Sequence, residues 1–126
     1  SRFFKDKMLP VNFRNSFRYK WLLNFFKKKR GNLLIVAHKK MKIFGFILIL
    51  KKKFGLQIDL IVTSKKYQKR KVGTSLINYT IKNYLTKNQV IRAGTQEDNF
   101  QANSLYKKLG FKKINKAQYV YHIHSI

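Results

Sequence analysis

Residues 97–111, which read EDNFQANSLYKKLGF, specify the fold more than any other segment of the chain. We predict a helix over about 99–109, and Gly110 ends it because glycine accommodates the backbone turn that follows a helix. Glu97 and Asp98 stand at the helix start, where carboxylates are stabilised by the positive end of the helix dipole. Because both ends of this helix are marked, the segments before and after it can be assigned relative to it.

A second patterned stretch, residues 58–76, reads IDLIVTSKKYQKRKVGTSL. It combines the end of a strand, a basic polar loop and the start of a helix predicted from Val72 to about Leu85. Free N–H groups at a helix N-terminus bind anions, and nearby Lys and Arg side chains strengthen that attraction. The loop from Gln68 to Thr74 could therefore hold a pyrophosphate, although it lacks the glycine spacing of a P-loop. The alternative is an ordinary solvated basic turn.

Together, the two stretches resemble the motifs of the GCN5-related N-acetyltransferase (GNAT) superfamily. Its cofactor motif is Gln/Arg-x-x-Gly-x-Gly/Ala after a strand, and a few dozen residues later comes Asn-x-x-Ala-x-x-Leu/Phe-Tyr-x-x-x-Gly-Phe. The key positions of the second motif are matched by Asn99, Ala102, Leu105, Tyr106, Gly110 and Phe111. The first is matched at Gln68 and Gly73, and the chain departs from it at Lys71, where the family has a glycine.

The resemblance implies acetyl-CoA as the cofactor and acetyl transfer to an amine as the reaction. It implies that an open, splayed strand edge at Ile61, Val62 and Thr63 pairs with the pantetheine arm and polarises the acetyl carbonyl. The implied diphosphate loop consists of Gln68, Lys69, Arg70, Lys71, Val72, Gly73 and Thr74. Asn99 and Ala102 are implied to lie at the pantetheine region, and Tyr106 to donate a proton to the departing thiolate.

Two features of the implied site stay open. The side chain of Lys71 either crowds the approach of the backbone to the diphosphate or adds positive charge to it. No general base is assigned, because each acid or histidine that could act as one also has a simpler structural role, and the family often uses a water chain. These residues are Asp59, Glu97, Asp98, His38, His122 and His124.

The sequence around the two motifs predicts an α+β fold in α/β/α layers, with a mixed, mostly antiparallel sheet flanked by helices. Three apolar runs with short basic connections predict a β-meander: Leu33–Ala37, Ile43–Leu50 and Leu56–Val62. The middle run is apolar at nearly every position, which predicts layers on both faces of the sheet. The other predicted elements are a helix from Phe13 to Arg30 after a break at Pro10, and strands Gln89–Thr95, Phe111–Ile114 and Gln118–His124.

The chain has 126 residues, no cysteine and a formal net charge of +25, from 29 Lys and Arg against 4 acids. This length suits one domain, 1–126, and an opening without Met suggests that the domain is trimmed on its N-terminal side. The absence of cysteine excludes disulfide scaffolds and thiolate metal sites, and we expect no metal. The apolar run Ile43–Leu50 is too short to span a membrane, so a cytoplasmic location is expected.

Finer similarities favour one acceptor class. Ser1-Arg2-Phe3 with Asp6, the segment Ala93–Gln96 and the ending Ala117–His122 are similar to bacterial acetyltransferases of the TDP-fucosamine type, which act on nucleotide-linked amino sugars. Coenzyme A and a small-molecule amine are the implied partners, with a homodimer left open. The high charge indicates a phosphate-rich partner or, alternatively, a compositional bias.

Other functions compete with this interpretation. One is acetylation of protein N-terminal or small amines on the same fold, and another is an inactive acetyltransferase fold kept for a structural role. A third is a basic RNA-binding module, because residues 42–49, KIFGFILI, partly resemble the stacking strand of an RNA-recognition motif. The predicted element order does not fit that motif, so neither nucleic acid nor membrane is favoured as a partner.

Overall fold

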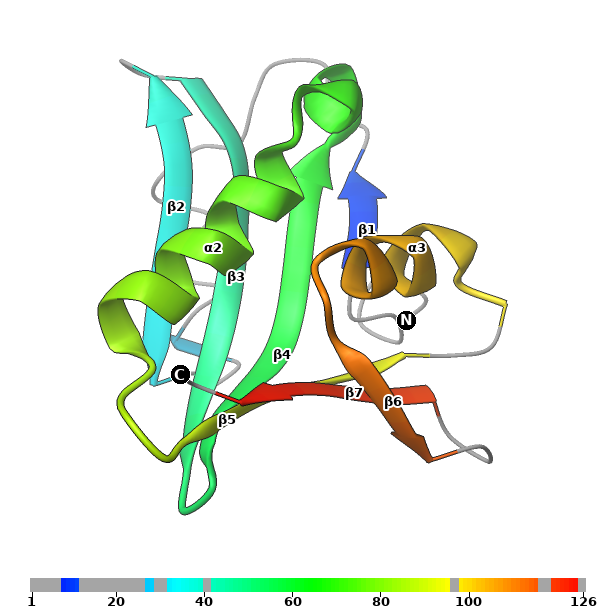
Figure 1. The fold of residues 1–126 in the computed structure, drawn as a ribbon. Helices are drawn as coiled ribbons and strands as arrows, with labels where there is room; N and C mark the ends of the chain where they lie inside the picture. Colours follow the sequence, from blue (N-terminus) through cyan, green and yellow to red (C-terminus); the bar gives the residue numbers. More distant parts are fainter. Residues whose placement is uncertain are drawn as a thin grey trace.

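The structure is a computed structural model that describes residues 8–11, 27–28, 32–39, 42–95, 98–115 and 119–124 (Figure 1). Its strands form one mixed seven-stranded sheet in the order β2-β3-β4-β5-β7-β6, with β1 paired to β4 off this path. The strands are β1 (Met8–Val11), β2 (Leu33–Lys39), β3 (Lys42–Lys52), β4 (Gly55–Ser64), β5 (Val90–Thr95), β6 (Lys112–Asn115) and β7 (Tyr119–His124). The helices are the 3₁₀ helix η2 (Lys65–Arg70), α2 (Val72–Tyr84) and α3 (Phe100–Lys108).

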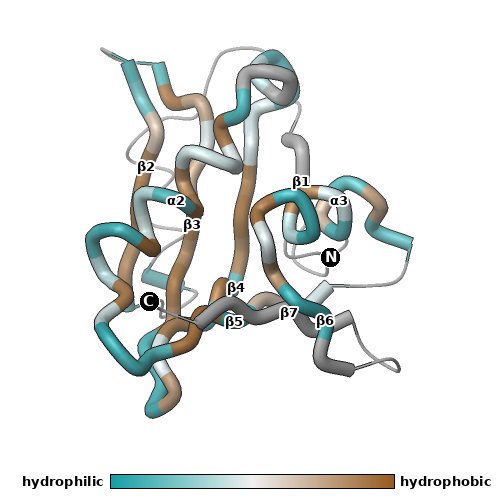
Figure 2. The backbone as a smooth tube through the Cα atoms, viewed as in Figure 1, coloured by the Kyte–Doolittle hydropathy of each residue, from teal (hydrophilic) through white to brown (hydrophobic). Residues whose placement is uncertain are grey.

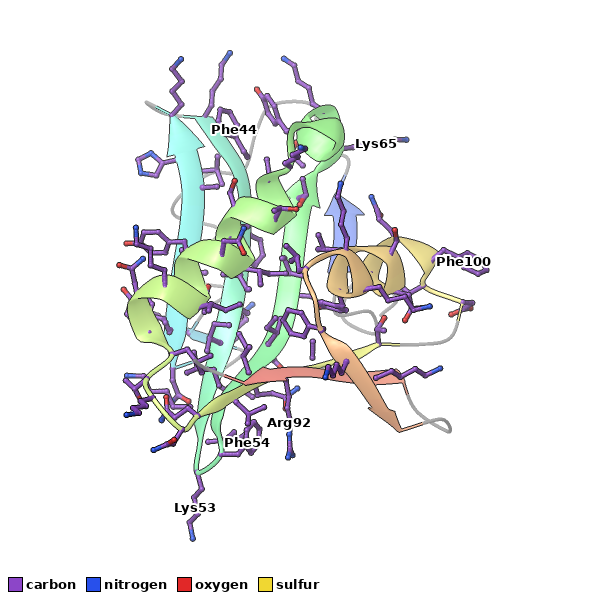
Figure 3. All side chains as sticks on the ribbon, viewed as in Figure 1. Phe44, Lys53, Phe54, Lys65, Arg92 and Phe100 are labelled. Atoms are coloured by element: carbon purple, nitrogen blue, oxygen red, sulfur yellow. The ribbon has the colours of Figure 1, made fainter. Side chains whose placement is uncertain are left out.

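The predicted meander is confirmed as β2, β3 and β4, which pair antiparallel in sequence order. Hydrophobic residues run along these strands, and hydrophilic residues gather at their ends (Figure 2). Lys53 lies at the tip of the hairpin between β3 and β4, where its charge stays in water (Figure 3). Apolar strands with charged turns therefore specify this half of the sheet locally.

Strand β3 is buried on both faces, as its nearly continuous apolar sequence predicts. One face carries Ile47 and Ile49 and packs against the apolar residues of α2 and α3. The opposite face carries Phe46 and Leu48, which form a second buried cluster with neighbours on β4. The helix predicted over 13–30, which belongs to the expected layers, lies outside the described residues except for Lys27 and Lys28, which are helical.

The other predicted elements are confirmed within a few residues of their ends. Strand β5, helices α2 and α3, and strands β6 and β7 occupy the segments whose periodicity and glycine signals predicted them. Two predictions are wrong. Residues 65–70 form η2 rather than a loop, and Pro10, expected to mark a break, lies inside strand β1. Proline is confined mainly to edge strands, because it lacks the N–H that a central strand uses in pairing with its neighbours.

Strand β4 changes its partner midway along one edge. Its first edge pairs with β3, and its second edge pairs parallel with β5 only as far as Ile58. A register shift against β3 leaves Asp59 as an extra residue, because Leu48 faces Leu60 while Ile49 faces Ile58. Such a bulge bends and twists a strand, which accounts for the divergence of β5 from β4 at this point.

Candidate functional site

The N-terminus of α2 is an electropositive helix start without a side-chain cap. Its N-cap, Lys71, makes no capping hydrogen bond through its side chain, and the first turn contains no acid. The N–H of Ser75 donates a 3.0 Å hydrogen bond to the carbonyl oxygen of Lys71. The N–H groups at the start of a helix carry partial positive charge, so this turn suits a phosphate group.

Lys71 adopts a left-handed backbone conformation, with φ 58° and ψ 32°. This is the region that glycine enters without the steric cost of a Cβ atom. The glycine that the family motif has at this position therefore has a conformational role, and Lys71 retains the conformation without glycine's freedom. The Lys71 side chain is exposed.

Replacing Lys71 with Gly should stabilise the chain. The left-handed conformation costs an L-residue about 1–2 kcal/mol, which glycine largely avoids, so we expect the free energy of unfolding to rise by about 1 kcal/mol. Thermal or urea unfolding measures this change. The matched control is Lys82→Gly in the last turn of α2, where glycine should cost up to about 1 kcal/mol. A Lys71→Gly variant no more stable than the parent would contradict the left-handed assignment.

The turn before α2 is anchored to the sheet by aromatic packing. Tyr67 of η2 is buried, and its ring centroid lies 4.3 Å from that of Phe44 on β3. Lys65 and Lys66 are exposed on the same turn. Gln68, Lys69 and Arg70 continue its backbone, but their side chains lie outside the description. The predicted diphosphate loop is thus a basic turn fixed by a buried tyrosine.

Gly45 allows the start of α2 to approach the sheet closely. It faces Thr63 in the register of β3 and β4. A Cβ atom at Gly45 would lie 2.5 Å from the carbonyl oxygen of Val62 and 3.0 Å from Cγ1 of Val72. Sequence reasoning missed this residue, although an isolated glycine inside an apolar strand signals close backbone approach.

The second motif forms α3 and its two ends. Asn99 is the N-cap, and its Oδ1 accepts a hydrogen bond of 3.2 Å from the N–H of Ala102. This hydrogen bond satisfies one of the free N–H groups at the start of the helix. Ala102 is fully buried against the sheet. Both residues thus have structural roles beside the cofactor roles that the resemblance implies.

The Gly-Phe end of the motif positions Tyr106. Gly110 has φ 93°, and the N–H of Phe111 donates a 3.0 Å hydrogen bond to the carbonyl of Tyr106. The N–H of Gly110 donates to the carbonyl of Lys107 at 3.1 Å, which completes a Schellman-type helix end. This turn brings the Phe111 ring to 5.3 Å from the Tyr106 ring. The motif's tyrosine, glycine and phenylalanine therefore act together to fix one side chain.

Tyr106 is completely buried in the larger apolar cluster. Burial raises the pKa of its phenol well above the usual value, because the phenolate would lose its hydration. The phenol is therefore a neutral proton donor throughout the physiological pH range. The protonated phenol is available as a general acid for a departing thiolate, and the raised pKa makes it a weaker acid than a solvent-exposed tyrosine.

The edge of β4 expected to be open is paired in the structure. Ile61, Val62 and Thr63 are buried, and β1 runs parallel to them along the edge that β5 has left. Among the described residues, Oγ1 of Thr63 has no hydrogen-bond partner. The divergence of the strands is present as expected, but the edge is not open because β1 occupies it.

The groups considered as general bases are not drawn into one cluster by the described structure. Asp59 is half-buried at the bulge of β4, Asp98 is exposed before α3, and His38 is exposed near the end of β2. Glu97 and the side chains of the C-terminal histidines lie outside the description. Asp59 is therefore the acid nearest in sequence to the paired edge of β4.

The described residues also line a cavity of about 450 Å³ between β2 and α2. Its walls include Leu34 and Val36 of β2, and Leu76 and Tyr79 of α2. None of the residues of the two motifs that were assigned to the cofactor lines it. We therefore place the candidate site at the start of α2 and the edge of β4 rather than in this cavity. None of the helices in the described ranges combines the length and apolarity needed to cross a membrane.

Comparison with known proteins adds independent findings. A family model described as an acetyltransferase (GNAT) domain matches residues 10–126. The spore coat polysaccharide biosynthesis protein SpsD of Bacillus subtilis (strain 168) is 27% identical over 124 residues, covering 98% of this chain and 42% of SpsD. N-alpha-acetyltransferase 30 of Dictyostelium discoideum is 30% identical over 116 residues, covering 88% of this chain and 60% of that protein. The chain thus spans only about half the length of these two relatives.

A solved structure shares the fold. The PaiA N-acetyltransferase of Thermoplasma acidophilum, crystallised in complex with coenzyme A, superposes with a TM-score of 0.63 at 20% sequence identity. The match covers 83% of this chain and 70% of that one. The mixed sheet with flanking helices predicted from the sequence is therefore the architecture of a known group of structures.

Proposed function

The chain belongs to the acetyltransferase (GNAT) domain family, and on this premise we propose that it transfers an acetyl group from acetyl-CoA to a primary amine. The observation that carries the proposal is that two suitable features occur together in this fold. The uncapped, acid-free start of α2 suits a diphosphate, and the buried phenol of Tyr106 suits the protonation of a thiolate. Both belong to the motifs that the sequence shares with the superfamily.

Each part of the site has a defined task in this proposal. Acetyl-CoA supplies the activated acetyl group. The N–H groups of Val72, Gly73 and Thr74 hold the diphosphate, and the exposed ammonium of Lys71 adds positive charge beside them. Tyr106 is the general acid for the departing thiolate, and its phenol stays protonated before the reaction because the apolar surroundings oppose phenolate formation. The buried hydroxyl of Thr63, which has no hydrogen-bond partner among the described residues, marks a polar position on β4.

We assign the acceptor to the amines carried by nucleotide-linked sugars. With 29 Lys and Arg against 4 acids, the chain repels cationic amines and attracts an acceptor that carries phosphate. Lys65, Lys66 and Lys71 concentrate exposed charge next to the candidate site. SpsD, named for polysaccharide biosynthesis, supports a sugar acceptor. The similarity to N-alpha-acetyltransferase 30 favours a second candidate, acetylation of a peptide N-terminus.

Thermal melting tests cofactor binding. A ligand that binds only the native state stabilises it by about 2.7 kcal/mol at a concentration of 100 times Kd, so saturating acetyl-CoA should raise Tm by several degrees. A single-stranded RNA oligonucleotide serves as the polyanion control. Stabilisation by RNA with no effect of acetyl-CoA would refute the acetyltransferase proposal in favour of nucleic-acid binding.

Acetylation assays test the acceptor. We expect kcat/KM to be highest for a TDP-linked amino sugar, lower for the same sugar without its nucleotide, and lowest for a peptide with a free N-terminal amine. The comparison of the linked and unlinked sugars isolates the contribution of the phosphates, which weakens with added salt. If kcat/KM were higher for the peptide than for both sugars, the acceptor would be a peptide N-terminus instead.

A further inference from the structure

The edge of β4 that the family resemblance assigns to the pantetheine arm is occupied by the chain itself. The register places Met8 opposite Ile61, Leu9 opposite Val62, Pro10 opposite Thr63 and Val11 opposite Ser64. One edge offers a single row of backbone N–H and C=O groups, which pairs with one partner at a time. We propose that β1 and the pantetheine arm of acetyl-CoA compete for β4, so that β1 must leave before the cofactor binds. This self-inhibition rests on the proposed function.

The pairing pattern shows that β1 lies on the edge left by β5. Residues 61–63 of β4 pair with β3 on one side and with β1 at the same positions. A strand has two edges, so β1 must lie on the edge opposite β3, which β5 shares only from Gly55 to Ile58. Strand β1 therefore fills the gap that the divergence of β5 creates. That gap is the place where a ligand could add to the sheet.

The site is closed while β1 is in place. Tyr106 is fully buried and Thr63 is 2% exposed, so the groups expected to meet the thioester are out of reach of solvent. Oγ1 of Thr63 is buried without a hydrogen-bond partner among the described residues. A buried hydroxyl left unpaired is unfavourable. A ligand that hydrogen-bonds to this side chain would gain an interaction that the described residues do not supply.

Strand β1 is also poorly built for permanent pairing. It has four residues, whereas β3 has 11 and β4 has 10. Pro10 lacks an N–H, so it cannot donate a hydrogen bond to β4. A short strand interrupted by proline binds an edge weakly, which makes it a displaceable occupant rather than a structural strand.

A reversible disulfide tests the competition. The chain has no cysteine, so Leu9→Cys combined with Val62→Cys introduces the only two thiols. Neighbouring strands lie about 4.8 Å apart, within the range of Cα separations that a disulfide bridges. Calorimetry with coenzyme A should give a Kd at least about tenfold weaker for the oxidised variant than for the same variant reduced. The matched control, Leu34→Cys with Leu48→Cys, links β2 to β3 and should bind equally in both redox states.

The outcomes separate this inference from the proposed function. Equal binding of coenzyme A by the oxidised and reduced forms of the Leu9→Cys, Val62→Cys variant would overturn the proposed competition. The acetyltransferase assignment would remain intact. Failure of the two thiols to cross-link under oxidation, shown by free-thiol labelling, would overturn the pairing itself. If coenzyme A bound neither to the parent nor to either double-cysteine variant, both proposals would be refuted.

A second variant shifts the equilibrium in the opposite direction. Leu9→Pro with Val11→Pro removes two further N–H groups from β1 and should favour its departure. When only a fraction of the molecules is competent, the apparent Kd is the intrinsic Kd divided by that fraction. We therefore expect coenzyme A to bind this variant about threefold or more tightly than the parent. Unchanged or weaker binding would count against self-inhibition.

Discussion

Replacing Tyr106 with Phe should lower kcat by about 100-fold or more while changing the KM for acetyl-CoA by no more than about twofold, because a positioned general acid contributes on the order of 10²–10⁴ to a rate. The substitution removes only the hydroxyl. The ring that packs 5.3 Å from Phe111 remains, so α3 and its Schellman-type end are preserved. Steady-state kinetics with acetyl-CoA and an acceptor amine measure both parameters.

The control is Tyr79→Phe on α2, where the phenol is 51% exposed and lies outside both motifs. Its kcat should equal that of the parent. A Tyr106→Phe variant with parental kcat would remove the phenol from the mechanism. A rise in KM equal to the fall in kcat/KM would instead indicate a role in binding alone.

The pH dependence gives Tyr106 a second readout. Burial raises the pKa of this phenol, so the native state keeps its proton at pH values where the unfolded phenol, with a pKa of about 10, has lost it. Above that pH the unfolded state binds fewer protons than the native state, and stability falls by about 1.4 kcal/mol per pH unit. Urea unfolding between pH 9 and about 11 should show a shallower decline for Tyr106→Phe than for the parent.

Replacing Gly45 with Ala should destabilise the fold by about 1–3 kcal/mol and weaken coenzyme A binding by about tenfold. The added Cβ would lie 2.5 Å from the Val62 carbonyl oxygen, so β3 and β4 must separate or α2 must rise from the sheet. Either movement displaces the start of α2 from the edge of β4, and the two halves of the candidate site lose their alignment. Chemical unfolding and calorimetry measure the two effects separately.

Gly94→Ala is the matched control, because a Cβ atom at this position of β5 meets no atom within 4 Å. Alanine in a strand is more favourable than glycine by about 0.5–1 kcal/mol, so this variant should be as stable as the parent or slightly more so. If Gly45→Ala behaved like Gly94→Ala in both assays, the close approach at Gly45 would have no role in positioning α2.

One basic residue away from the candidate site, Arg92, has a local structural role. The guanidinium of Arg92 on β5 lies 4.2 Å from the ring centroid of Phe54 in the turn before β4, where both side chains lie together (Figure 3). This cation–π contact ties the β3–β4 hairpin to β5, at the end of the sheet away from the start of α2 (Figure 1). Not every basic residue behind the net charge of +25 therefore serves the candidate site. Lys65, Lys66 and Lys71, next to the start of α2, are the ones with a proposed ligand.

Much of the fold and half of the candidate site could be predicted from local patterns. The strands of the meander follow from apolar runs with charged turns, and α3 follows from Asn99 at its start and Gly110 at its end. The burial of Tyr106 follows from the same motif, because the glycine turn brings Phe111 onto its ring. These features depend on residues within one helix or hairpin, so short-range spacing specifies them.

Local patterns therefore specify the elements, their order along the meander and the family motifs. Tertiary packing established the role of Gly45, whose neighbours Val62 and Val72 are distant in sequence. It also decided the occupant of the β4 edge, since β1 pairs with residues about fifty positions away and only where β5 has diverged. Periodicity identifies a strand but not its partner, because pairing depends on which edges remain available once the rest of the sheet has formed.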